Sequence, residues 1–377
     1  MIIGIPKETH HEEQRVAFIP SSADRLIKKG AQIIIEAGLG TSIGIPDEEY
    51  KKAGAGVNTD RKILLSSSDM ILRLRKPPLE EIGLLKKGSI HISFLDPFNE
   101  KALVQALAQN QISAFSMEMI PRTSRAQKMD ALSSQASLAG YVAVILAAAG
   151  LPKIFPMLMT PAGTIAPARV FIIGAGVAGL QAIATAKRLG ARVEAFDTRA
   201  VVKEQVQSLG AKFVEIDLGQ TGQTDQGYAK ALTAEQLEKQ RQGMARVCAQ
   251  SDIIITTAQL FGRRAPVVLT KDMIAQMKPG TIIVDMAVES GGNVEGSRIN
   301  EEVVTQNGVR IFGMANLPGR VAVHASGMYS ANLHNLLEEY WDKDNKTFKI
   351  DLEDEIIKGA LITHQGQIVN EMVKNIR

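Results

Sequence analysis

The sequence has 377 residues, of which 45% are apolar and 22% are charged, and its formal net charge is +3. This length predicts two or three domains, and the near-neutral balance gives no case for a nucleic-acid-binding protein. The single cysteine, Cys248, excludes an internal disulfide and is typical of a reducing compartment. Because Cys248 lies in an apolar helical pattern, we expect a core residue and not a nucleophile.

The N-terminal stretch turns polar within six residues, which is unlike a signal peptide. The longest apolar run, 138–151, is shorter than the roughly 20 residues that span a bilayer, so we expect a buried helix there. The chain by itself is therefore expected to be soluble.

Strand-like and helix-like segments alternate along the chain. In the first 125 residues the expected strands are 2–6, 32–38, 70–78, 89–96 and 112–118, and the expected helices are 21–30, 47–55 and 99–109. A second series starts near residue 168, with later strands at 211–217, 252–258, 280–287 and 309–316. Such alternation predicts parallel sheets with helices on both faces.

An amphipathic helix at 325–341 follows the last strand and is expected to return to the first domain. The predicted fold class is α/β, with two Rossmann-like domains whose mostly parallel sheets flank a cleft. The predicted domains are 1–130 plus 327–377, and 131–326.

Gly174, Gly176 and Gly179 form the pattern G-x-G-x-x-G between an expected strand and an expected helix. In this context the glycines permit a tight turn, close approach of a pyrophosphate and close packing of helix on strand. Asp197 ends the next strand and can accept hydrogen bonds from a ribose. Glycines that serve only a turn are the alternative.

The carboxylate of Asp197 would repel a 2′-phosphate, which favours NAD(H) over NADP(H). Arg199 complicates this inference, because an arginine near that position can hold such a phosphate.

Several segments together resemble the alanine dehydrogenase and nicotinamide nucleotide transhydrogenase superfamily over almost the whole chain. They are "GIPKETHHEEQRVAFIP", "RLRKPP", "RAQKMDALSSQASLAGY", "GAGVAGLQAIATAKRLGARVEAFDTR" and "VDMAVESGGN". Within the superfamily, "RTSRAQKMDALSSQ" and "GYAKALT" are most similar to the NAD(H)-binding subunits of proton-translocating transhydrogenases.

The sequence departs from alanine dehydrogenases at two positions. The resemblance places Arg75 where those enzymes have a lysine and Asp96 where they have a histidine, while Arg15 is kept. An arginine does not give up its proton, and an aspartate titrates near pH 4. The acid–base groups for a carbonyl or imine substrate are therefore missing, whereas hydride transfer between two nicotinamides needs none.

The polar strip between two apolar segments has several interpretations. Ser124 and Gln127 could form a capping box, and a solvated helix face is another alternative. The resemblance implies instead that the strip contacts the nicotinamide end of NAD(H), and that its helix is a hinge between domains. The residues to which it assigns this role are Arg122, Gln127, Asp130 and Ser133.

The resemblance adds further residues to the NAD(H) site. With the three glycines, Asp197 and Arg199, it places Val177, Thr198, Gly227, Tyr228 and Thr257 there. Gly227 and Tyr228 belong to the polar insertion 218–235, which matches a loop that closes over nucleotide. A disordered insertion is the alternative. Asp285 and Glu289 are equally consistent with shaping a loop and with a site role, and we expect His324 to be structural. No metal-ligand spacing is present.

The resemblance implies one subunit of a proton-translocating, Re/Si-specific NAD(P)+ transhydrogenase. This subunit would bind NAD(H), form a homodimer, and pass hydride to NADP(H) on a partner subunit. It would be cytoplasmic and attached to the inner membrane through partner subunits. The alternatives are an alanine dehydrogenase-like amino acid dehydrogenase and a non-catalytic NAD(H)-binding regulator.

Overall fold

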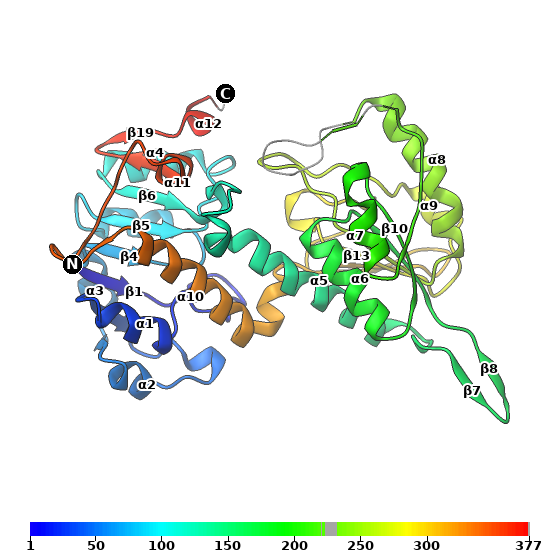
Figure 1. Ribbon diagram of the computed structural model, residues 1–377, viewed down its shortest axis with the longest axis horizontal. Helices are drawn as coiled ribbons and strands as arrows, with labels where there is room; N and C mark the ends of the chain where they lie inside the picture. Colours follow the sequence, from blue (N-terminus) through cyan, green and yellow to red (C-terminus); the bar gives the residue numbers. More distant parts are fainter. Residues whose placement is uncertain (220, 223–231, 376–377) are drawn as a thin grey trace. The chain divides into compact units, whose positions relative to one another are not determined.

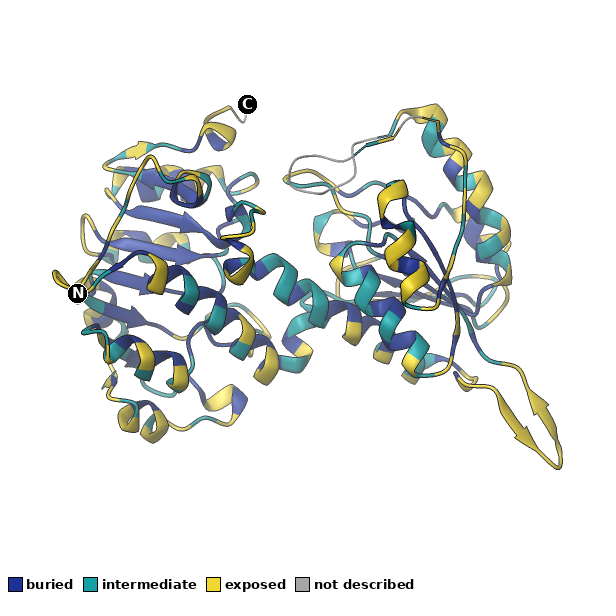
Figure 2. Cartoon of the chain, viewed as in Figure 1, coloured by how far each residue is buried: buried dark blue, intermediate teal, exposed yellow. Residues whose placement is uncertain are grey.

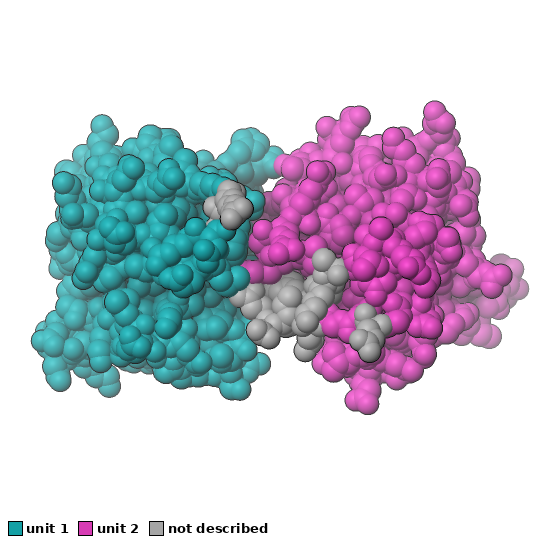
Figure 3. All heavy atoms as spheres, turned by 90° about the horizontal axis from the view of Figure 1, so that it is seen from above, with its two compact units in different colours: residues 1–135, 321–377 teal, residues 136–320 magenta. Residues whose placement is uncertain are grey.

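The computed structural model describes residues 1–219, 221–222 and 232–375. Its backbone packing divides the chain into two compact units (Figure 3). Unit 1 combines Met1–Gln135 with Val321–Arg377, and unit 2 is Ala136–Arg320. The domain boundaries inferred from the sequence, at 130/131 and 326/327, stay a prediction.

Unit 1 is built on an eight-stranded sheet of order β19-β18-β6-β5-β4-β1-β2-β3 (Figure 1). Its strands are β1 (Ile2–Ile5), β2 (Gln32–Glu36), β3 (Gly56–Asn58), β4 (Met70–Leu72), β5 (Ile90–Ser93), β6 (Ser113–Ser116), β18 (Leu361–His364) and β19 (Gln367–Ile368). The first six strands pair in parallel, and only β18 and β19 run antiparallel to their neighbours. Strands β4, β5 and β6 are buried throughout, as expected for a sheet covered on both faces.

The helices of unit 1 follow the alternation expected from the sequence. They are α1 (Pro20–Ile27), α2 (Asp47–Lys52), α3 (Arg61–Ser67), α4 (Lys101–Gln109), α10 (Ala322–Glu339), α11 (Glu355–Ala360) and α12 (Glu371–Lys374). A small hairpin of β16 (Trp341–Asp342) and β17 (Thr347–Phe348) follows α10. Helix α10 contributes Tyr329, Leu333, Leu336 and Leu337 to the unit 1 core, so the segment 325–341 does return to this unit.

Unit 2 contains a seven-stranded sheet of order β11-β10-β9-β12-β13-β15-β14. Its strands are β9 (Arg169–Ile173), β10 (Arg192–Phe196), β11 (Lys212–Phe213), β12 (Ile253–Thr256), β13 (Ile282–Asp285), β14 (Glu301–Val304) and β15 (Arg310–Gly313), and its helices are α6 (Val177–Arg188), α7 (Lys203–Ser208), α8 (Ala234–Gln250) and α9 (Lys271–Ala275). Only the edge strand β14 is antiparallel. The predicted fold class, with mostly parallel sheets in both halves, is confirmed.

Helix α5 (Ala131–Gly150) is long and apolar enough to cross a bilayer by length and composition, a property it shares with core helices of soluble proteins. One face is buried, with Ala143 and Ala147 fully covered, whereas Tyr141 and Ile145 are more than one third exposed. A Cβ on Gly140 would lie 2.2 Å from the carbonyl oxygen of Ala178, so this glycine permits close packing against α6.

A hairpin of β7 (Leu158–Thr160) and β8 (Gly163–Ile165) projects from unit 2 and was not expected from the sequence (Figures 1 and 2). All six strand residues are exposed.

Candidate functional site

The glycine turn joins the end of β9 to the start of α6. Gly174 has a φ of +98°, which favours glycine. A Cβ on Gly179 would lie 1.9 Å from the carbonyl oxygen of Gly174, and a Cβ on Gly174 would lie 2.4 Å from Oγ1 of Thr257. The turn therefore needs both glycines for its own packing.

Gly176 differs from these two glycines, because its backbone is in an ordinary extended conformation. A Cβ on Gly176 would meet no atom closer than Nη2 of Arg199, at 4.0 Å. The chain itself therefore does not require a glycine there. The open space lies at the N-terminus of the twelve-residue helix α6, where backbone N–H groups and the helix dipole suit a phosphate. This arrangement fits the pyrophosphate of a dinucleotide.

The carboxylate of Asp197 lies beside the turn and is almost completely buried. Its Oδ2 accepts a hydrogen bond from the backbone N–H of Ala175 at 2.7 Å, which ties the end of β10 to the turn. Arg199 donates to the same carboxylate through its backbone N–H, Nε and Nη2, at 2.8–2.9 Å. The hydrogen bonds to Asp197 raise the pKa of Arg199. Arg199 therefore neutralises this aspartate in the ligand-free chain.

Three other expected residues lie around the turn. The hydroxyl of Thr257, which follows β12, donates to the carbonyl oxygen of Gly174 at 3.1 Å and so holds the turn in place. Val177 opens α6 and is 40% exposed. The carbonyl oxygen of Thr198 accepts a hydrogen bond from Thr221. Gly227 and Tyr228 lie outside the described residues.

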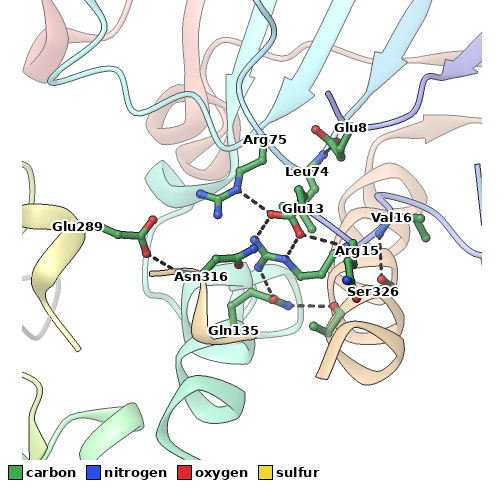
Figure 4. Close-up of polar contacts among 12 residues, drawn as sticks. Glu8, Glu13, Arg15, Val16, Leu74, Arg75, Gln135, Glu289, Asn316 and Ser326 are labelled. Carbon is green, nitrogen blue, oxygen red and sulfur yellow. Dashed lines mark hydrogen bonds and ion pairs between the residues drawn. The ribbon is translucent and has the colours of Figure 1, made fainter. Parts of the chain in front are cut away.

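The residues that the sequence left between structural and site roles are now resolved by their contacts. Asp285 is fully buried and accepts hydrogen bonds from the backbone N–H groups of Ala287 and Asn293, so it shapes a loop. Glu289 accepts from the backbone N–H of Asn316 (Figure 4). His324 lies exposed near the start of α10.

Cys248 is a buried core residue, as predicted. Burial raises the pKa of its thiol to about 12, which makes it a poor nucleophile.

The polar strip of unit 1 does not start with a capping box, and that alternative is wrong. Gln127 opens a separate 3₁₀ turn, Gln127–Met129, whose N-cap is Ala126, without a side-chain cap bond. Helix α5 begins only after Asp130, so Gln127 and Ser133 do not share one continuous helix, contrary to the sequence-based expectation. The physical reason is that Asp130, with a ψ of +88°, leaves helical geometry and caps α5 itself.

Three of the four strip residues meet at one carboxylate. Asp130 accepts hydrogen bonds from the backbone N–H of Ser133 at 2.9 Å and from its hydroxyl at 2.6 Å. Nε of Arg122 lies 3.9 Å from Oδ2 of Asp130. Gln127 is exposed on the preceding turn.

The carboxyl edge of the unit 1 sheet carries a network that the sequence analysis missed (Figure 4). The carboxylate of Glu13 accepts hydrogen bonds from Nη2 of Arg15 at 2.7 Å and from Nε of Arg75 at 2.8 Å. Arg15 also donates to Oε1 of Gln135 at 2.9 Å, and Gln135 donates to the carbonyl oxygen of Ala325. Both arginines thus bind an internal carboxylate.

Asp96, at the position of the alanine dehydrogenase histidine, is also tied into the unit 1 edge. Its backbone N–H donates to Glu118, and its carboxylate lies 3.7 Å from Nζ of Lys76. Among the described residues, no group of three or more histidine, cysteine, aspartate or glutamate side chains could hold a metal ion.

The glycine turn, the capped aspartate and the position of the turn at the carboxyl ends of β9 and β12 define a dinucleotide-binding protein of Rossmann type. The profile "Alanine dehydrogenase/PNT, N-terminal domain" matches residues 4–139, and "Alanine dehydrogenase/PNT, C-terminal domain" matches residues 143–371. The chain belongs to the alanine dehydrogenase/PNT family.

Within this family the chain is more similar to transhydrogenase subunits than to alanine dehydrogenases. It is 44% identical to the first part of the NAD(P) transhydrogenase subunit alpha of Rhodospirillum rubrum, over 98% of both chains. The crystal structure of a transhydrogenase from Sinorhizobium meliloti superposes with a TM-score of 0.88 and 43% identity, covering 98% of this chain and 100% of that one. An alanine dehydrogenase from Halomonas elongata is a more distant relative, 31% identical over 85% of this chain and 82% of the relative.

The contrast between Gly176 and Gly179 generates a prediction. Gly176→Ala should leave the thermal unfolding midpoint of the ligand-free chain unchanged, because the added methyl group meets nothing in the chain. It should weaken NADH binding at least tenfold, or about 1.4 kcal/mol, because the methyl group occupies the space of the pyrophosphate. Gly179→Ala should lower both quantities. Equilibrium dialysis and thermal unfolding check this, and unchanged NADH affinity in Gly176→Ala would contradict it.

The Glu13 network predicts a dependence of stability on pH. Burial alone would raise the pKa of Glu13, but hydrogen bonds from Arg15 and the charges of Arg15 and Arg75 outweigh it and hold the pKa at about 2, below the usual 4.5. The ionised carboxylate therefore stabilises the fold above pH 4.5, and this contribution is lost as the pH falls toward 2. Glu13→Gln should lower the free energy of unfolding by about 3 kcal/mol at pH 7 and by less than half as much at roughly pH 3.

Urea unfolding at several pH values measures this effect, with Glu12→Gln as the control, since Glu12 is exposed. A difference between wild type and Glu13→Gln that does not change with pH would contradict the account.

Proposed function

We propose that this chain is the NAD(H)-binding subunit of a proton-translocating NAD(P) transhydrogenase. It would bring NADH next to NADP+ held by a partner subunit, with Re/Si-specific hydride transfer between the two nicotinamides. The observation that carries the proposal is a mismatch between the two halves. The glycine turn with its open space at Gly176 fits a dinucleotide, whereas Arg15 and Arg75 are bound to Glu13 and would not serve a carbonyl substrate.

The chemistry in this proposal is the transfer of a hydride from C4 of NADH to C4 of NADP+, which yields NAD+ and NADPH and needs no protein acid or base. The chain would hold, orient and shield the ring. The helix N-terminus at Gly176 would bind the pyrophosphate, and Asp197 would bind the adenosine ribose after Arg199 moves aside. Arg122, Gln127, Asp130 and Ser133 would contact the nicotinamide end, with Gly227, Tyr228, Thr198 and Val177 as further contacts. These assignments rest on the family resemblance of the matching residues.

The partners in this proposal are an NADP(H)-binding beta subunit and membrane subunits that couple hydride transfer to proton movement. The chain would then be cytoplasmic and peripheral to the membrane through those subunits. The longer relative from Cereibacter sphaeroides, "NAD(P) transhydrogenase subunit alpha", supports this arrangement, because this chain corresponds to only 71% of its length.

The test is hydride transfer from NADH to NADP+ with and without the NADP(H)-binding partner subunit. We expect rapid NADPH formation only with the partner, and Gln127→Ala should slow it at least tenfold, or by about 1.4 kcal/mol in the barrier. Lys128→Ala is the matched control, because its side chain lies on the same turn and pairs with Glu339.

Pyruvate with ammonium and NADH serves as the parallel substrate test. Turnover of pyruvate by the chain alone would sink the proposal and favour an amino acid dehydrogenase. NADH binding without transfer in either assay would favour a regulator.

We also propose that the chain forms a homodimer. The β7–β8 hairpin supports this, because Met157, Leu158, Met159 and Ile165 are all between 45% and 71% exposed, and projecting apolar side chains of this kind mark interaction surfaces. Sedimentation equilibrium should give twice the chain mass, and Met159→Asp should shift the equilibrium toward the monomer. A monomeric wild-type chain at micromolar concentration would exclude this.

A further inference from the structure

Asn332, in the middle of α10, makes two hydrogen bonds to the segment 127–134, which we call the strip. Its Oδ1 accepts from the hydroxyl of Ser134 at 2.7 Å, and its Nδ2 donates to the carbonyl oxygen of Lys128 at 3.0 Å. Lys128 belongs to the 3₁₀ turn, and Ser134 belongs to the first turn of α5. One buried amide therefore joins two different elements of the strip.

The two bonds of Asn332 bracket the point where the strip changes direction. Asp130 separates the 3₁₀ turn from α5, and its ψ of +88° is not helical. The position of Gln127 relative to Ser133 therefore depends on backbone angles at a single junction. Because Asn332 holds the residues on both sides, it fixes that junction from outside the strip.

A second asparagine one turn further along α10 supports one side of this arrangement. Nδ2 of Asn335 donates to the same carbonyl oxygen of Lys128 at 3.0 Å. Asn335 is exposed, whereas Asn332 is buried. Asn332 in addition reaches the α5 side of the junction, through Ser134.

We propose that Asn332 is a positioning residue for hydride transfer, acting through Lys128 and Ser134 on the strip that contacts the nicotinamide end of NAD(H). This inference rests on the proposed function. Asn332 would not touch the dinucleotide. Its loss would let Gln127 and Ser133 shift relative to each other, and misplacement by about 1 Å can slow a reaction by roughly a hundredfold.

The test compares Asn332→Ala with Ser330→Ala, a control on the same helix. Ser330 is also fully buried, and its hydrogen bonds go to Ile19 and Ser22, away from the strip. With the partner subunit present, Asn332→Ala should lower the single-turnover rate of hydride transfer at least about tenfold. The dissociation constant of NADH should change less than about threefold, since the glycine turn supplies most of the binding.

A double-mutant cycle separates positioning from general loss of stability. Ser134→Ala removes the hydroxyl that Asn332 binds, so its effect on the transfer rate should not add to that of Asn332→Ala. The proposal is overturned if Asn332→Ala and Ser330→Ala have equal transfer rates, or if the effects of Asn332→Ala and Ser134→Ala on the rate are fully additive.

Amide hydrogen exchange keeps this inference distinct from the proposed function. Asn332→Ala should speed exchange at residues 128–134, whereas Ser330→Ala should not. A wild-type chain that transfers no hydride with its partner would refute the proposed function, and the exchange result would then still decide whether Asn332 fixes the strip. Unchanged exchange in Asn332→Ala would overturn the inference even if hydride transfer is intact.

Discussion

The candidate dinucleotide site depends on the contact between the start of α6 and the end of β9. Gly179 lies against the carbonyl oxygen of Gly174, where a methyl group would be 1.9 Å from that oxygen. This approach aims the N-terminus of α6 at the carboxyl edge of the sheet, where open α/β sheets bind ligands. Thr257 and Asp197 hold the turn from the two neighbouring strands, so three parallel strands fix one small loop.

Unit 1 has the same kind of sheet but a different carboxyl edge. There the charges are satisfied within the chain, because Glu13 binds both Arg15 and Arg75. The two edges give the chain an uneven chemistry, since one leaves space at a helix N-terminus and the other closes two arginines around a buried carboxylate. A protein that only binds and orients a nucleotide needs the first edge and can do without open acid–base chemistry at the second.

The sequence predicted the alternating elements, the parallel sheets, the glycine turn and the buried Cys248, because these depend on local patterns of apolar residues and glycines. It did not predict what depends on distant pairs. The Glu13 network joins residues 62 and 120 positions apart, and the contacts of Asn332 span 198 and 204. The capping box failed because Ser124-x-x-Gln127 is only one of two start signals, and Asp130 caps α5 instead. Two asparagines three residues apart within an apolar helix were a signal that could have identified the strip's support.

The central claim is that hydride passes directly between two nicotinamides without acid–base groups from this chain. The most direct measurement follows deuterium from C4-labelled NADH into NADPH by mass spectrometry, in the presence of the NADP(H)-binding partner. The account predicts that the label appears in NADPH and that unlabelled NADH in D₂O gives NADPH without deuterium. Incorporation of solvent deuterium at C4, or loss of the label to water, would contradict it.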